Sequence, residues 1–365
     1  MTDRDTPVIE AGGLKKVYYG RTVVDVEHLS VTSGEVLAVL GPSGSGKSVL
    51  LRLINLLERP TQGTIRFNGR EVQGLEGRSR VEVSRRMAMI FQDPLLFRGT
   101  VFENVSYGLR VRKLPAAERE QRVSEVLEIV GLRDLAATNV ATLSGGEAQR
   151  VAVARALVIK PEVLLFDEPF ANLDVPTRHS LQDEVRAVMR ERNKTAVFVT
   201  HDQEEAARMG DRILVLYEGR IAQEGEARDI FYRPTSEFVA RFVGVDNLYP
   251  GVIESAENGL ARVTIGGGVF EVATDRPVGQ TVTLGLRPED ITLVPVEGLG
   301  ASASSRNTFE GMVASVEMRG PLARVVLVCP FELSVLVTRR SQEEMQIDVG
   351  KKFGARFKAT AVVVI

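Results

Sequence analysis

Residues 41–48 read GPSGSGKS and follow a short apolar run at residues 35–40 (EVLAVL). A strand that leads into Gly-x-x-x-x-Gly-Lys-Ser is typical of a phosphate-binding loop. The glycines allow the backbone to wrap closely around a phosphate, and the N–H groups of the loop and of the following helix point at the anion. We expect Lys47 to contact the β- and γ-phosphates and the Ser48 hydroxyl to ligate Mg²⁺. The predicted phosphate contacts are Gly41, Pro42, Ser43, Gly44, Ser45, Gly46, Lys47 and Ser48.

The rest of the first 240 residues alternates strand-like runs with helix-like segments. Residues 163–166 (VLLF) and 196–199 (AVFV) are short apolar runs, which indicate a buried and largely parallel sheet. Residues 115–130 are rich in polar side chains but carry apolar ones along one helical face. We therefore predict an α/β P-loop nucleotide-binding domain over residues 1–242, with a helical subdomain at about 93–158.

Two carboxylates, Asp167 and Glu168, directly follow the run at 163–166. An acid at the end of a buried strand is costly unless it meets a cation, and Mg²⁺ is the obvious one. We therefore assign Asp167 to the metal together with Ser48. Glu168 is then placed to orient or deprotonate the water that attacks the phosphate.

The sequence changes character after about residue 245. Short Val-, Thr- and Leu-rich runs between Gly and Pro indicate small β-barrels. LARVTI at 260–265 returns as LARVVL at 322–327, so the segment repeats. We predict an all-β region over residues 246–365, built of two copies at about 246–296 and 304–365.

Composition narrows the range of functions. The 365-residue chain carries 46 basic and 48 acidic side chains, and its net charge of −2 does not favour nucleic acid as a partner. The single cysteine, Cys329, excludes an internal disulfide and suits a reducing compartment. No apolar run approaches the roughly 18 residues that span a bilayer. If the protein works at a membrane, we expect another chain to span it.

The stretch LSGGEAQR at residues 143–150 resembles the signature loop of ATP-binding-cassette (ABC) ATPases. Only Glu147 departs from the common form, which has glutamine there. The motifs occur in the order of that family, and the resemblance covers about residues 7–240. It implies that ATP lies between the phosphate loop of one subunit and the signature loop of the other. We therefore expect a homodimer.

The resemblance also assigns roles to single residues. It implies that Gln92 (in IFQDPLLF) senses Mg²⁺ and the attacking water and links the site to a membrane partner. It implies that His201 (in VFVTHD) contacts the γ-phosphate and that Asp174 (in ANLD) crosses the dimer interface. Tyr19 is expected to stack on adenine, with the adjacent Tyr18 as the alternative. Further ATP contacts are implied at Ser144, Gly145 and Gly146. The expected catalytic set is Lys47, Gln92, Glu168 and His201, and the expected metal ligands are Ser48, Gln92 and Asp167.

The all-β region resembles the TOBE domains of importer ATPases and, more narrowly, molybdate-binding Mop domains. Residues 304–307 (SSRN) resemble the Ser-Ala-Arg-Asn opening of Mop domains, and residues 357–360 (FKAT) resemble their closing segment. In that family these segments offer N–H groups, hydroxyls and a lysine to a tetrahedral oxyanion, which needs no metal. The implied oxyanion site is Ser304, Arg306, Asn307, Lys358, Ala359 and Thr360.

The two copies are not equally suited to an anion. The first copy has Arg287-Pro288 where the second has Lys358-Ala359, and proline lacks an N–H donor. The alternative interpretation is that both copies only pack and dimerise, since a fold does not dictate a function.

Together these features predict the ATPase subunit of a molybdate or tungstate importer, bound peripherally at the cytoplasmic side of the cell membrane. We expect it to energise a separate transmembrane permease, to be linked indirectly to an extracytoplasmic substrate-binding protein, and to be regulated by internal molybdate or tungstate. Importers of sulfate, polyamine, sugar or ferric iron have similar ATPases and are the alternatives. A soluble ABC protein acting on DNA or the ribosome fits less well, because the chain has neither a second cassette nor a basic or coiled-coil insertion. A plain oxyanion-storage module is disfavoured by the complete hydrolytic set.

Overall fold

A computed structural model describes residues 7–298 and 305–365. The chain divides into two compact units after Ala227. The N-terminal unit carries apolar cores on both faces of its central sheet, and the C-terminal unit has a core of its own.

The division lies upstream of the boundary at 242–246 expected from the sequence. Helices α8 (Ala227–Tyr232) and α9 (Glu237–Phe242) pack with the β-region. The Arg287 guanidinium explains this attachment, because it donates to the carbonyls of Phe231 and Val243 at 2.6 Å each.

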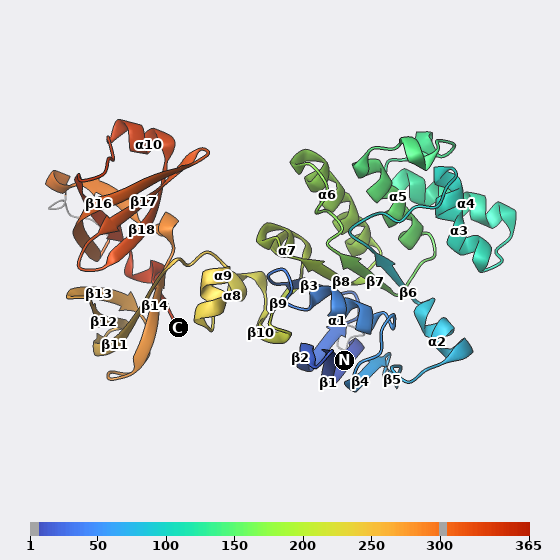
Figure 1. Cartoon of the computed structure of the whole chain (residues 1–365), viewed down its shortest axis with the longest axis horizontal. Helices are drawn as coiled ribbons and strands as arrows, with labels where there is room; N and C mark the ends of the chain where they lie inside the picture. Colours follow the sequence, from blue (N-terminus) through green and yellow to red (C-terminus); the bar gives the residue numbers. More distant parts are fainter. Residues whose placement is uncertain (1–6, 299–304) are drawn as a thin grey trace. The chain divides into compact units, whose positions relative to one another are not determined.

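The N-terminal unit is centred on a sheet with the strand order β10-β9-β3-β8-β7-β6 (Figure 1). Its strands are parallel except β10, which forms an antiparallel hairpin with β9. Alternate side chains of the central strands enter two different cores, so these strands are apolar on both faces. The bounds are β3 (Val36–Leu40), β6 (Met87–Ile90), β7 (Val163–Asp167), β8 (Thr195–Thr200), β9 (Arg212–Tyr217) and β10 (Arg220–Gly225).

One face of this sheet packs against α1 and an antiparallel sheet with the order β2-β1-β4-β5. The other face packs against α5 and α6, and α3 and α4 extend this core into a helical subdomain. Helix α4 lies within the predicted helix at 115–130. The antiparallel strands are β1 (Pro7–Tyr18), β2 (Arg21–Thr32), β4 (Gln62–Phe67) and β5 (Arg70–Glu71). The helices are α1 (Lys47–Ile54), α2 (Gly77–Ser84), α3 (Val101–Val111), α4 (Ala116–Ile129), α5 (Gly145–Leu157), α6 (Val175–Glu191) and α7 (Gln203–Met209), with short 3-10 turns η2 (Arg133–Leu135) and η3 (Val140–Thr142).

The C-terminal unit contains two antiparallel sheets, with the orders β13-β12-β11-β14-β20 and β15-β19-β16-β17-β18. The first copy supplies β11 (Asn247–Glu257), β12 (Leu260–Ile265), β13 (Gly268–Ala273), β14 (Thr281–Leu286), η4 (Pro288–Asp290), β15 (Thr292–Pro295) and η5 (Val296–Gly298). The second supplies β16 (Asn307–Arg319), β17 (Leu322–Val328), β18 (Glu332–Thr338), α10 (Arg339–Glu344), β19 (Lys352–Phe357), η6 (Ala359–Ala361) and β20 (Val363–Val364).

The two copies exchange their last strands. β15 of the first copy pairs with β19 of the second, and β20 of the second pairs with β14 of the first. Apolar side chains of both copies fill one common core. The copies are therefore interleaved, whereas the repeat pattern alone suggested two separate small barrels. Periodicity reports which residues form strands, but it does not report which strands pair.

Two buried asparagines occupy equivalent positions and join the copies. Asn247, at the start of β11, donates to the Ser334 carbonyl at 2.9 Å and accepts from the Ser334 N–H at 2.7 Å. Asn307, at the start of β16, makes the same pair of bonds to the Glu271 backbone, each at 2.8 Å. Each copy thus uses one side-chain amide to extend the other copy's edge strand.

We expect Asn247→Ala to expose the Ser334 backbone and to destabilise the C-terminal unit by about 2 kcal/mol, because a buried N–H and carbonyl lose their partner. Hydrogen exchange measured by mass spectrometry should show faster exchange across β18. Glu254→Ala, at an exposed position of the same strand, is the matched control. Equal exchange in the two variants would contradict this anchoring role.

Candidate functional site: a nucleotide site and a basic edge

The loop at residues 41–46 joins β3 to α1 and lies tightly against its neighbours. A Cβ on Gly41 would overlap the Leu216 carbonyl oxygen, and one on Gly46 would lie 2.5 Å from the Val23 carbonyl oxygen. Gly46 also has φ of 104°, a conformation that favours glycine, and it stands directly before the first turn of α1. The sequence pattern therefore has a steric cause as well as a ligand-binding one.

Lys47 is folded back onto this loop. Its ammonium donates to the carbonyls of Gly41 and Pro42 at 2.7 and 3.0 Å and lies 3.8 Å from a Glu168 carboxylate oxygen. Burial lowers the pKa of Lys47, and the carboxylates of Glu168 and Asp167 oppose this shift. Phosphate oxygens are stronger acceptors for an ammonium than carbonyls are. The side chain is therefore placed to exchange the carbonyls for phosphate.

Ser48 and Asp167 meet at the end of β7. The Ser48 hydroxyl donates to the Asp167 carboxylate at 2.7 Å. Burial raises the pKa of Asp167 and the adjacent Glu168 charge adds to the rise, while the Ser48 hydrogen bond opposes it. A hydroxyl and a desolvated carboxylate side by side are oxygen ligands of the kind that Mg²⁺ takes beside a phosphate. These two residues fit a magnesium ion.

Glu168 lies between Lys47 and His201. One carboxylate oxygen is 3.8 Å from the Lys47 ammonium, and the other is 2.8 Å from Nδ1 of His201. The Glu168 backbone has φ of 46°, a strained region for a residue with a side chain, and its N–H donates to the Val199 carbonyl. Strain of this kind persists where the surrounding structure holds it, and it is common at functional sites. Here it turns the carboxylate toward the loop and His201.

Gln92 follows β6, whose last residue, Ile90, pairs with Phe166 of β7. The adjacent strand ends bring Gln92 to the same edge of the sheet as Asp167. Its side chain is exposed, and Gln149 of α5 holds the preceding backbone by donating to the Phe91 carbonyl at 3.4 Å.

The signature loop and Asp174 lie at the starts of two packed helices. Ser144 caps α5 in a capping box with Glu147, and Asp174 caps α6 by accepting from the Thr177 N–H. A Cβ on Gly146 would come within 2.7 Å of the Thr177 methyl group, so the two helix starts touch. Among the described residues, no hydrogen bond joins Ser144, Gly145 or Gly146 to the phosphate loop.

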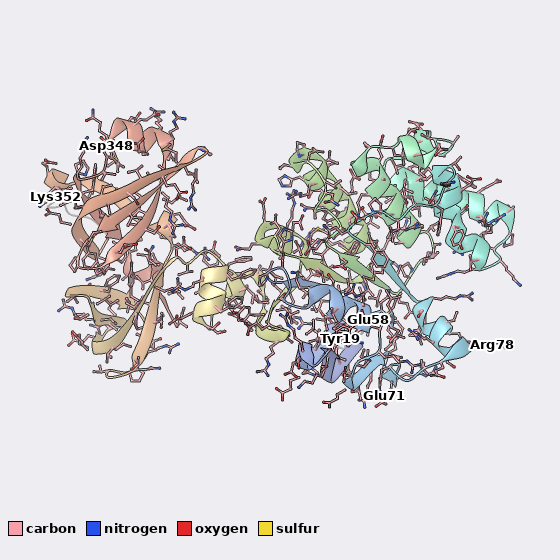
Figure 2. The ribbon with its side chains drawn as sticks, viewed as in Figure 1. Tyr19, Glu58, Glu71, Arg78, Asp348 and Lys352 are labelled. Atoms are coloured by element: carbon pink, nitrogen blue, oxygen red, sulfur yellow. The ribbon has the colours of Figure 1, made fainter. Side chains whose placement is uncertain are left out.

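The two adjacent tyrosines differ in their surroundings. The Tyr18 hydroxyl donates to the Glu58 carboxylate, and burial raises its pKa to about 12. Tyr19 is fully exposed in the turn between β1 and β2, with φ of 49° (Figure 2).

A cavity of about 560 Å³ opens beside the phosphate loop. The part of its wall that comes from outside the loop was not expected from the sequence, because no local motif marks these positions. β2 and the β9–β10 turn reach the loop only through tertiary pairing, as when the Gly219 N–H donates to the Ser45 carbonyl. The wall is formed by Arg21, Thr22, Val23, Pro42, Ser43, Gly44, Ser45, Tyr217, Glu218 and Gly219.

The second copy of the β-region brings part of the expected oxyanion site to the end of the β16–β19 strand pair, which we call the basic edge. Asn307 pairs with Phe357 across β16 and β19, so Arg306 and Lys358 extend side by side beyond that pair. Lys358 and Thr360 are exposed, and Ala359 is buried in η6. Ser304 lies outside the described residues.

Two contacts at this edge were not expected from the sequence. Both ends of the buried Asn307 amide are engaged by the Glu271 backbone. The Arg306 guanidinium lies 3.5 Å from the Glu271 carboxylate. Asn307 therefore holds the edge together, and the cationic groups that face outward are those of Arg306 and Lys358.

The equivalent edge of the first copy is used internally. Arg287 stands where the second copy has Lys358, and its guanidinium holds the carbonyls of Phe231 and Val243. Pro288 begins η4 and is buried. This edge offers neither a free cation nor the N–H of an alanine.

Sequence comparison shows what class of protein carries this site. The ABC transporter family model matches residues 24–171, and the TOBE domain model matches residues 303–364. The chain is 42% identical over 334 residues to the molybdate/tungstate import ATP-binding protein of Pyrococcus horikoshii, covering 91% of this chain and 92% of that one. The chain belongs to the ATP-binding subunits of ABC transporters, and it is an ATPase.

The relatives differ in the cargo named for them. The spermidine/putrescine import ATP-binding protein of Mannheimia succiniciproducens is also 42% identical, covering 79% of this chain and 77% of that one. Among solved structures, a post-hydrolysis dimer of an ATP-binding cassette bound to ADP and Pi matches with a TM-score of 0.56 and 31% identity, covering 60% of this chain and 99% of that one. CbiO1 from Clostridium perfringens, part of the ABC transporter complex CbiONQ, matches with a TM-score of 0.59 and 30% identity, covering 66% of this chain and 96% of that one.

The same comparisons confirm the predicted fold class, an α/β P-loop domain followed by an all-β region. Within the described ranges, no helix is both long and apolar enough to cross a membrane.

We expect Gly46→Ala to destabilise the N-terminal unit more than Gly44→Ala. Both positions have positive φ, so both substitutions carry a similar backbone cost of about 1 kcal/mol. Only the Cβ at position 46 meets a carbonyl oxygen, whereas nothing lies within 4 Å at position 44. Thermal unfolding without nucleotide should rank the variants in this order, and equal melting temperatures would contradict the steric account.

Proposed function

We propose that this ATPase is the subunit that energises a molybdate or tungstate importer. The observation that carries the proposal is the placement of Arg306 and Lys358 next to the Asn307–Phe357 pair of β16 and β19, in the segment that resembles oxyanion-binding domains. Two neighbouring cations suit a tetrahedral dianion better than a polyamine, and the nearby Glu271 carboxylate is already matched by the Arg306 guanidinium at 3.5 Å. The similarity to the molybdate/tungstate import ATPase of Pyrococcus horikoshii extends over 91% of the chain, against 79% for the polyamine import ATPase of Mannheimia succiniciproducens.

In the proposed ATPase cycle, Lys47 and the loop amides hold the phosphates of ATP. Ser48, Asp167 and Gln92 would hold Mg²⁺, which neutralises charge on the phosphates. Glu168 accepts the proton of the attacking water, and His201 orients Glu168 and contacts the γ-phosphate. Tyr19 stacks on adenine, because it is exposed whereas Tyr18 is bonded to Glu58.

The cycle requires two copies of the chain. Ser144, Gly145 and Gly146 have no hydrogen bond to their own chain's phosphate loop among the described residues. In the proposal they bind the ATP held by the second copy, and Asp174 lies at the same interface. A related cassette forms a dimer bound to ADP and Pi.

A transmembrane permease is the proposed partner of the helical subdomain, on the cytoplasmic side of the membrane. An apolar groove of about 450 Å³ is lined by residues on both sides of Gln92, among them Phe91 and the exposed side chains of Leu95 and Phe97. Its position would let a permease helix sense Gln92. The extracytoplasmic substrate-binding protein would act only through the permease.

We expect Glu168→Gln to bind ATP, to form a stable dimer and to lower kcat by about 100-fold or more, because the amide cannot accept the water's proton. ATPase assays and size-exclusion chromatography with ATP test this. Glu191→Gln, an exposed change at the end of α6, is the control. Unchanged hydrolysis in Glu168→Gln would remove Glu168 from its assigned role.

Calorimetric titration with molybdate, tungstate, sulfate and spermidine tests the oxyanion proposal. We expect molybdate or tungstate to bind more tightly than sulfate, and Lys358→Ala to weaken this binding by about tenfold or more. Lys352→Ala, at the start of β19 and labelled in Figure 2, removes an exposed lysine paired with Glu310 and should leave binding unchanged. Binding of spermidine alone would favour a polyamine importer.

A further inference from the structure

A buried polar network lies beneath the loop that carries His201, and the ATPase mechanism described above does not use it. Its centre is Glu205 on α7, only 5% exposed. One carboxylate oxygen accepts from the Thr200 hydroxyl at 2.6 Å, and the other accepts from the Gln182 amide of α6 at 3.1 Å. Burial raises the pKa of Glu205, while the Thr200 hydrogen bond and the nearby Arg178 charge oppose the rise.

This network fixes the backbone on both sides of His201. Thr200, which precedes His201, accepts from the Asp202 N–H at 3.0 Å while its hydroxyl donates to Glu205. Asp202 in turn caps α7 by accepting from the N–H groups of Glu204 and Glu205. The position of His201 therefore follows from the position of the Glu205 carboxylate.

Arg178 extends the network to the segment that carries Asp174. Its guanidinium donates to the Leu173 carbonyl at 3.0 Å, one residue before Asp174. The same group lies 3.7 Å from the Asp202 carboxylate and 4.0 Å from the Glu205 carboxylate. The Arg178 side chain thus contacts both the segment before Asp174, which we place at the dimer interface, and the loop of His201, which we place at the γ-phosphate.

The Arg178 contacts are incomplete. Its Nε is buried and has no hydrogen-bond partner among the described residues. A Glu205 carboxylate oxygen lies 4.0 Å from this Nε, which is beyond hydrogen-bond distance. A buried unpaired donor is costly, so a small approach of the two loops would be favoured by formation of this bond.

We propose that Arg178 and Glu205 are positioning residues that couple the Asp174 segment to the His201 loop within one chain. Movement of Asp174 when two copies close is transmitted through Arg178 to Glu205, and through Thr200 to His201. This coupling rests on the proposed roles of His201 and Asp174, and Arg178 and Glu205 are the residues that link them.

The same two helices supply a matched control. Arg208 of α7 and Asp183 of α6 form a tighter ion pair, with three donor–acceptor distances between 2.9 and 3.2 Å. This pair also joins α6 to α7, but in the described part of the chain neither of its side chains hydrogen-bonds to Leu173 or to the residues beside His201. If a link between the helices were all that mattered, losing the Arg208 pair would cost at least as much as losing Arg178.

The experiment compares Arg178→Met with Arg208→Met in the full chain, using steady-state ATPase kinetics and thermal unfolding. We expect Arg178→Met to lower kcat by about tenfold or more with KM for ATP changed by less than about threefold, because a misplaced His201 affects the reaction more than binding. Arg208→Met should keep kcat within about twofold. Arg178→Lys should restore part of kcat, because an ammonium keeps the charge beside Glu205.

Equal kcat for Arg178→Met and Arg208→Met would overturn the proposal, as would a kcat loss that follows the fall in melting temperature in both. If Arg178→Met does not fold, Thr200→Val tests the same path, since it keeps the side chain's shape and removes the hydroxyl. A normal kcat in that variant would also overturn the proposal. His201→Ala distinguishes failure of the coupling from failure of the proposed function: undiminished hydrolysis in this variant would remove the proposed role of His201 itself.

Discussion

The nucleotide site depends on one electrostatic constraint, the gathering of Lys47, Asp167 and Glu168 out of water at the ends of β3 and β7. Burial lowers the pKa of Lys47 and raises the pKa of Asp167, and the opposite charges beside each group oppose these shifts. The strained backbone of Glu168 brings its carboxylate into this cluster and against His201. These charged groups are already held together by contacts within the chain, so the site is preorganised for the charges of ATP.

The C-terminal unit shows how two similar copies acquire different roles. The copies exchange β15 and β20 and share one core, so neither can change shape without the other. At their equivalent edges, Arg287 is consumed in holding α8 and α9, whereas Lys358 faces outward. An anion bound near Lys358 would therefore act on a unit in which the two copies share one core. The equivalent position of the first copy, Arg287, is bonded to the backbone of α8 and to the residue that follows α9.

Several features of the fold and of the nucleotide site could be predicted because each depends on a short run of consecutive residues. The loop at 41–48, the carboxylates after 163–166 and the helix found as α4 each depend on local periodicity or a local motif. The fold class and the ABC family were confirmed on this basis. The strand exchange, the engagement of Asn307 by Glu271 and the Arg178–Glu205 link could not be predicted, because their partners are brought together only by the folded chain.

The sequence by itself determined which chemical groups this protein carries: a phosphate-binding loop, two adjacent acids after a buried strand and a β-region with cationic residues in its second copy. The tertiary structure alone decided how those groups are deployed. In the folded chain Tyr18 is hydrogen-bonded to Glu58 while Tyr19 is exposed. Arg287 binds the backbone carbonyl of Val243, and Arg178 links the segments around Asp174 and His201. The physical reason is that residue type sets which interactions are available, whereas burial and strand pairing, which depend on the whole chain, set which of them are satisfied.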